Sequence, residues 1–264
     1  MTHAPALVRQ GRFLFRWRNF LPLPAVLYVI GLQRFGPPVD ESLFPLLRAG
    51  AAVSASAGLA IRGAVVGRLP PGTSSRSTAT MATPLLNTLG PYSVVRHPLY
   101  VGNVLMWTGV SMLWELWWLA IINVLLMTLY YERIAFAEEM YLKRTFGETY
   151  VVWASRTPAV LPRLSAWRPP EHPFSVHRAV TREYPGVLVI TASMFALRAL
   201  ADLRLGVGPF PSTEWILLLE AGVLLYLIGR VYAKLPSLKS AAGRRREGVR
   251  RRRSSRVSSI RFGP

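Results

Sequence analysis

Two stretches of sequence decide the fold of this chain: GPYSVVRHPLYVGN at residues 90–103 and YERIAFAEEMYLKRTFGETY at residues 131–150. A long apolar passage separates them, and a charged pair lies on each side of it, Arg-His at 96–97 and Glu-Glu at 138–139. Charges at the edge of a bilayer core are expensive to desolvate, so they usually mark a functional site. The pattern therefore predicts membrane-crossing helices with a site at one end.

Composition and hydropathy predict an all-α protein, a polytopic integral-membrane helical bundle. The chain has 264 residues and is 51% hydrophobic, which is more apolar than an ordinary soluble domain. We expect about six transmembrane helices, because several of the apolar runs approach the ~20 residues that a crossing helix needs. These runs lie at residues 20–36, 43–66, 98–113, 116–137, 185–203 and 213–232.

The distribution of arginine predicts the orientation in the membrane. The net charge is +19, and basic residues gather before the first run, in the second and fourth connections and in the tail. Cytoplasmic segments carry such an excess of Lys and Arg, so both termini and both charged pairs are expected on the cytoplasmic side. Arginine far exceeds lysine, and Ala, Gly and Pro are abundant, which is typical of a GC-rich bacterium. We therefore expect a bacterial inner membrane.

Several classes of site are not expected. The chain has no cysteine and only four histidines, so disulfides, thiolate chemistry and a metal centre are not predicted. The basic tail, with RRREGVRRRRSSR at residues 244–256, is typical of a segment that binds anionic lipid. No aromatic interleaving accompanies it, so nucleic-acid binding is not predicted.

The chain is expected to divide into five segments. A turn-rich loop and a Pro-rich connector separate the dense motif region from its flanks. The segments are an N-terminal membrane hairpin and cytoplasmic loop at 1–83, the core at 84–165, the connector at 166–184, a C-terminal membrane hairpin at 185–233 and a basic, disordered tail at 234–264.

The spacing of the charged residues suggests a ligand. Pro98 suits the first turn of a helix, and Arg96, Tyr100 and Asn103 would then share one face. A helix N-terminus with a cation can bind a carboxylate or phosphate, and the glutamates at 138–139 suit an ammonium or ribose hydroxyls. S-adenosylmethionine carries a carboxylate, an ammonium, ribose hydroxyls and a sulfonium, although spacing alone leaves other ligands open.

The motifs closely resemble the isoprenylcysteine carboxyl methyltransferase family and its phospholipid N-methyltransferase relatives. They are RHPxYxGN at 96–103, ERxxxxEE at 132–139, FGExY at 146–150 and RxPxxLP at 156–162. The resemblance covers about residues 85–165, under a third of the chain. It implies a helical membrane bundle that holds S-adenosylmethionine in a cytoplasmic pocket made by these motifs.

The resemblance also implies roles for single residues. Arg96 and Glu139 would act at the reacting groups. Which of the two glutamates is catalytic and which holds the cofactor stays open. Contacts with the cofactor are expected from His97, Tyr100, Asn103 and Glu138.

The expected function is S-adenosylmethionine-dependent methyl transfer to a lipophilic acceptor, a small molecule or a lipid. One alternative is phospholipid N-methylation. Another is an NADPH-dependent reductase of the sterol type, whose members carry a similar R-H-x-x-Y-x-G signature but usually an acidic residue where this chain has Asn103. A third is a membrane or nucleic-acid-binding protein without catalytic activity.

Overall fold

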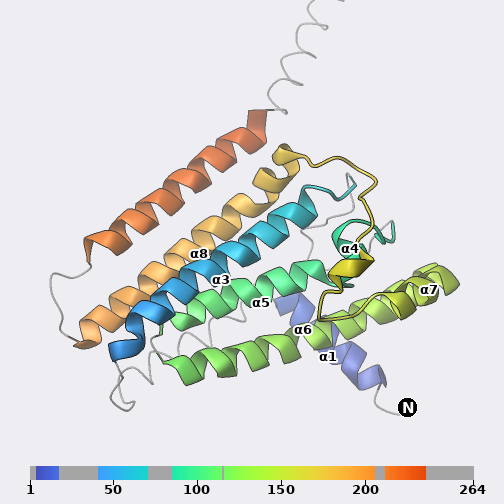
Figure 1. Cartoon of the computed structure of the whole chain (residues 1–264), viewed down its shortest axis with the longest axis horizontal. Coiled ribbons are helices and arrows are strands. Elements are labelled where there is room, and N and C mark those ends of the chain that lie inside the picture. Colours follow the sequence, from blue (N-terminus) through green and yellow to red (C-terminus); the bar gives the residue numbers. More distant parts are fainter. Residues whose placement is uncertain (1–3, 18–40, 71–84, 115, 206–211, 236–264) are drawn as a thin grey trace, which may run out of the picture.

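The computed structural model describes residues 4–17, 41–70, 85–114, 116–205 and 212–235, and all regular structure in these residues is helical (Figure 1). The all-α prediction is confirmed. The longer helices are α1 (Ala4–Trp17), α3 (Phe44–Val66), α5 (Pro98–Met112), α6 (Trp117–Phe146), α7 (Glu148–Arg156) and α8 (Val176–Leu205). Short elements are η1 (Glu41–Leu43), α4 (Pro91–Val94) and η2 (Leu164–Ala166), and a last helix spans Thr213–Leu235.

Four of the described helices are long and apolar enough to cross a membrane, rather than the six expected. They are α3, α6, α8 up to Leu200, and Thr213–Leu235. The run at 98–113 forms α5, whose 15 residues fall short of the ~20 that a crossing helix needs. The run at 20–36 lies outside the described residues.

Small residues bring α3 and α5 into close contact. A side chain on Gly58 would lie 2.5 Å from the carbonyl oxygen of Gly102, so both positions admit only glycine at this approach. Ser54 adds a hydrogen bond of 2.8 Å to the carbonyl oxygen of Leu105. Such contacts between small residues are a common way for helices to associate in a membrane. The short α5 is thereby held along α3.

A buried turn joins α5 to α6 and places the far end of α6 at the site. Leu113, Trp114 and Leu116 around this turn are buried in the main hydrophobic core. From there α6 returns along α5 and continues to Phe146, where Gly147 ends it with a φ of 55°. Phe146-Gly147 is therefore a helix end, as the sequence predicts. The charged pairs at 96–97 and 138–139 consequently meet at one end of the bundle.

The connector before the last hairpin is partly helical. α8 begins at Val176, nine residues before the apolar run that starts at 185, and Pro185 lies inside the helix. The Ser175 hydroxyl accepts a hydrogen bond of 3.3 Å from the Arg178 N–H, which is an N-cap interaction. This early start brings Glu183 into the helix beside α3, and the final helix lies along the outside of α8 (Figure 1).

Candidate active site

Backbone contacts hold the Arg96-His97 pair at the start of α5. Pro98 is the first helical residue and His97 is the N-cap, as expected from the sequence. The Arg96 N–H donates to the carbonyl oxygen of Pro158 at 2.9 Å, and the Arg163 N–H donates to that of Val94 at 2.9 Å. The segment after α7 therefore runs against the turn before α5 and fixes its position.

The Arg96 side chain connects this turn to α6. Its Nη1 donates to both carboxylate oxygens of Glu139, each at 2.8 Å, and its Nε donates to the Thr157 carbonyl oxygen at 2.9 Å. Charge-assisted bonds of this kind are the strong ones in proteins. Arg96 and Glu139 are each about a quarter exposed, so the ion pair lies at the edge of the bundle rather than deep within it.

His97 lies between the two glutamates. Its Nε2 is 2.9 Å from Oε1 of Glu139, and its Nδ1 is 3.6 Å from Oε2 of Glu138. Burial favours the neutral ring, but hydrogen bonds and charge from Glu138 and Glu139 outweigh it and raise the pKa of His97 to about 9. At pH 7 the ring is therefore an imidazolium, and its charge together with that of Arg96 balances the two carboxylates.

Tyr100 completes the cluster from the next turn of α5. Its hydroxyl donates to Oε2 of Glu138 at 2.7 Å. The ring stacks between His97 and Tyr131, with centroids 5.3 Å and 5.0 Å away. Among the described residues, both recorded contacts of Glu138 are made by its Oε2, and none is made by its Oε1. Glu138 is also the more exposed of the two glutamates, at 31% against 24% for Glu139.

Asn103 lies apart from this cluster and belongs to a second one. Its Oδ1 accepts a hydrogen bond of 2.6 Å from Nη1 of Arg62 on α3. Arg62 also donates to both oxygens of Glu183 on α8, at 2.8 and 2.9 Å. Sequence reasoning missed both charged residues. Arg62 could have been found because the apolar run at 43–66 holds only two charged residues, Arg48 and Arg62. A charge within such a run is rare and usually paired.

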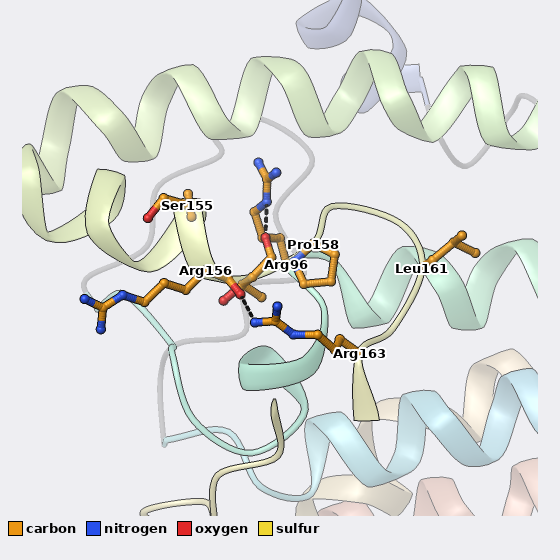
Figure 2. Close-up of a pocket in the computed structure, with 8 residues that line it drawn as sticks. Arg96, Ser155, Arg156, Pro158, Leu161 and Arg163 are labelled. Carbon is orange, nitrogen blue, oxygen red and sulfur yellow. Dashed lines mark hydrogen bonds between the residues drawn. The ribbon is translucent and has the colours of Figure 1, made fainter. Parts of the chain in front are cut away.

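A cavity of about 330 Å³ opens beside Arg96 (Figure 2). The segment from Ala154 to Arg163 supplies the rest of its lining, including Arg156 and Arg163. Figure 2 shows the Arg163 side chain directed at the carbonyl oxygen of Arg156, to which it donates, while the Arg96 guanidinium turns toward α6. The volume is at the small end of ligand sites, which run from roughly 300 to 1,000 Å³. Its arginine lining suits an anionic group.

The N-terminus of α5 itself offers less to an anion than the sequence suggests. Pro98 has no N–H, and the N–H groups of Tyr100 and Val101 both donate to the carbonyl oxygen of His97. Free N–H groups at a helix start are what make it an anion site, and few remain here. Any anion at this position would therefore depend on the arginine side chains.

Tyr150 on α7 is a further buried polar group beside the cluster. Among the described residues, its hydroxyl has no hydrogen-bond partner of good geometry. Burial and the neighbouring carboxylate of Glu139 raise the pKa of Tyr150, so it stays a neutral phenol. In the described part of the chain, no three His, Asp or Glu residues gather as metal ligands would.

The core of the chain is similar to a known protein family. Residues 76–149 match the family model of phospholipid methyltransferases. That family belongs to the isoprenylcysteine and phospholipid methyltransferase superfamily. The resemblance inferred from the motifs is thereby confirmed over these residues, which include all of the residues predicted for the site.

Two curated relatives match over 92 residues. A nickel-cobalt-cadmium resistance protein, NccN, of Alcaligenes xylosoxydans is 42% identical to this chain, and a cobalt-zinc-cadmium resistance protein, CzcN, of Cupriavidus metallidurans is 39% identical. Each match covers 35% of this chain and 42% of the relative, so this chain spans less than half the length of either protein. No solved structure matches the chain significantly.

Proposed function

We propose that the protein is an integral-membrane methyltransferase that uses S-adenosylmethionine and acts on a lipophilic acceptor at the cytoplasmic face. The observation that supports this best is the charge-balanced cluster of Arg96, His97, Tyr100, Glu138 and Glu139. It lies within the segment that matches the methyltransferase family. Four membrane-grade helices support the choice of a lipophilic acceptor.

The residues of the cluster fit the groups of S-adenosylmethionine. Among the described residues, Oε1 of Glu138 makes none of the recorded contacts and a third of the side chain is exposed, so it can accept a hydrogen bond from an ammonium or a ribose hydroxyl. The arginine-lined cavity suits a carboxylate. Glu139 is already committed to Arg96 and His97, so we assign cofactor contact to Glu138 and the positioning of Arg96 to Glu139.

The bound cofactor would supply an electrophilic methyl group on a sulfonium, and the products would be the methylated acceptor and S-adenosylhomocysteine. Transfer of this kind needs alignment and exclusion of water more than acid–base chemistry. The chain's part is to orient the acceptor through Arg96, which is anchored by Thr157 and Glu139. The stacked rings of His97, Tyr100 and Tyr131 line one side of the cluster.

The state of His97 bears on the class of acceptor. With a pKa of about 9 it is protonated at pH 7 and cannot remove a proton from an ammonium substrate. Glu139 is held by two cationic partners, and Glu138 is assigned to the cofactor, so neither carboxylate is free to act as the base. An acceptor that is already anionic, such as a lipophilic carboxylate or thiolate, needs no base. We therefore favour such an acceptor.

Phospholipid N-methylation is the second candidate, because the matching family model is that of phospholipid methyltransferases. The names of NccN and CzcN concern resistance to metals, and we take no substrate from them. Membranes incubated with methyl-labelled cofactor separate the two reactions. Base-labile, volatile methanol would indicate a methyl ester, whereas stable label in a phospholipid would indicate N-methylation and refute our preference.

Binding of the cofactor is tested by calorimetric titration of the purified full chain with S-adenosylhomocysteine. We expect saturable binding with one site. Glu138→Gln should weaken it by more than tenfold, or about 1.4 kcal/mol. Absence of binding to the unaltered protein would refute the proposed function. Protection from thermal unfolding by NADPH alone would favour a reductase instead.

A further inference from the structure

The first helix, α1, has two distinct faces. Gly11 is buried against α6, where a side chain would collide with the carbonyl oxygen of Arg133 and with Ala137. The Tyr130 hydroxyl donates to the carbonyl oxygen of Leu14 at 3.1 Å on the same side. One face of α1 is therefore fixed to α6, immediately before the glutamates of the site.

The opposite face of α1 is basic and aromatic. At 3.6 residues per turn, Arg9, Arg12, Phe13, Arg16 and Trp17 all lie on the side away from Gly11. All five are exposed, with Phe13 at 61% and Trp17 at 47%, and the two rings contact each other. The helix contains no Asp or Glu. Its outer face thus combines positive charge with apolar rings.

The direction of α1 also differs from that of the bundle. Figure 1 shows α1 crossing α6 steeply, whereas α3, α5, α6 and α8 run roughly alongside one another. The crossing lies toward the end of the bundle where α4 and α7 are found (Figure 1). If the long helices cross the bilayer, a helix that crosses them steeply near their end lies along the membrane surface.

We propose that the outer face of α1 binds the anionic headgroup layer of the membrane. Helices that lie in the interface bury apolar and aromatic residues in the headgroup region and direct Lys or Arg to anionic lipid. Aromatic rings gather at the same depth in membrane proteins. Arg9, Arg12 and Arg16 provide the charge, and Phe13 and Trp17 provide the apolar contact. The residues of this surface are distinct in the sequence from the basic tail at 244–256.

The contact has a consequence for the site. α1 packs on α6 at Arg133 and Ala137, the last of which directly precedes Glu138. Fixing α1 to the headgroup layer would therefore fix the height of the glutamates relative to that layer. This consequence rests on the proposed function, whereas the lipid contact itself does not.

Because the chain has no cysteine, a single cysteine can be labelled anywhere on it. A spin label on Phe13→Cys would be compared with one on Thr145→Cys, an exposed site near the end of α6. The full chain would be placed in bilayer discs of equal phosphatidylcholine and phosphatidylglycerol. We expect the label at 13 to be relaxed by oxygen, which dissolves in lipid, and protected from a water-soluble nickel complex. The label at 145 should show the reverse.

The charge is tested in the same discs with all three arginines of α1 changed to glutamine. Each arginine near an anionic surface is worth about fivefold in binding, so losing all three should shift the equilibrium between lipid-contacting and water-exposed label by roughly a hundredfold. The control combines Lys143→Gln with Arg144→Gln, which removes exposed charges from α6 instead of α1, and it should leave the lipid contact of the label at 13 unchanged.

Three results would overturn the proposal. The label at 13 could be fully open to the nickel complex, which would place α1 in water. It could be shielded from both reagents, which would indicate a second copy of the chain on this face. The label at 13 could also contact lipid as strongly in discs of pure phosphatidylcholine, or after loss of the three arginines, as it does in the mixed discs. Either result would exclude recognition of anionic lipid. If the purified protein fails to bind S-adenosylhomocysteine while the labels behave as expected, only the proposed function fails.

Discussion

Replacing Glu139 by glutamine should disrupt the site without changing its shape. Glu139 accepts two hydrogen bonds from Nη1 of Arg96 and one contact from His97, at 2.8, 2.8 and 2.9 Å. Glutamine keeps one acceptor oxygen but loses the negative charge, so the imidazolium and the guanidinium repel each other with only one carboxylate left nearby.

The expected magnitude follows from the exposure of these groups. Breaking a fully buried ion pair costs about 3–5 kcal/mol, and an exposed one costs under about 1 kcal/mol. Arg96 and Glu139 are 22% and 24% exposed, so we expect about 2 kcal/mol. That energy corresponds to roughly 30-fold in an equilibrium constant.

The assay is calorimetric titration with S-adenosylhomocysteine alongside thermal unfolding in the same detergent. Glu139→Gln should lower the affinity about 30-fold if Arg96 must be held in place for binding. Glu171→Gln is the matched control, because Glu171 is an exposed glutamate outside the motifs with the same charge to lose. An affinity within twofold of the unaltered protein, or an equal loss in Glu171→Gln, would refute the reasoning.

Three further predictions concern neighbouring groups. Arg96→Lys should abolish turnover, because a lysine cannot bond the carboxylate and a backbone carbonyl together; full activity would make Arg96 a mere membrane anchor. Glu183→Gln removes the carboxylate charge paired with Arg62, and Asp202→Asn breaks the buried pair with Arg198 on the same helix, so each should lower the unfolding temperature. Only Glu183→Gln should also raise KM for the cofactor, because Arg62 holds Asn103, which the sequence predicts to be a cofactor contact. Equal KM values would make the Arg62 cluster purely structural. Because the pKa of His97 is raised, the stabilisation from its charge is complete below pH 6.5 and is lost as the pH rises through about 9. The unfolding temperature should therefore fall over that range in the unaltered protein and fall less in His97→Gln. Parallel curves for the two proteins would contradict the assigned pKa.

The sequence alone determined most of the long helices and the two charged pairs that meet at the cluster. Hydrophobic runs of membrane length identified the long helices, and Pro98 and Gly147 marked where α5 begins and α6 ends. These signals are local, because helix length, capping and proline geometry depend on neighbouring residues. The order of the motifs also indicated that the Arg-His and Glu-Glu pairs would meet, and the structure brings them into contact.

Only the tertiary structure decided which polar side chains bond to each other. The face shared by Arg96, Tyr100 and Asn103 predicted one site, but Asn103 bonds to Arg62 because α3 approaches α5 at Gly58 and Gly102. Glu183 joins them only because α8 starts nine residues before its apolar run. Likewise, the docking of α1 on α6 could not be seen in its arginines, which a charge rule assigns equally well to any cytoplasmic segment. Periodicity places a residue on a face of its helix, and only the packing of that helix against others determines what the face meets.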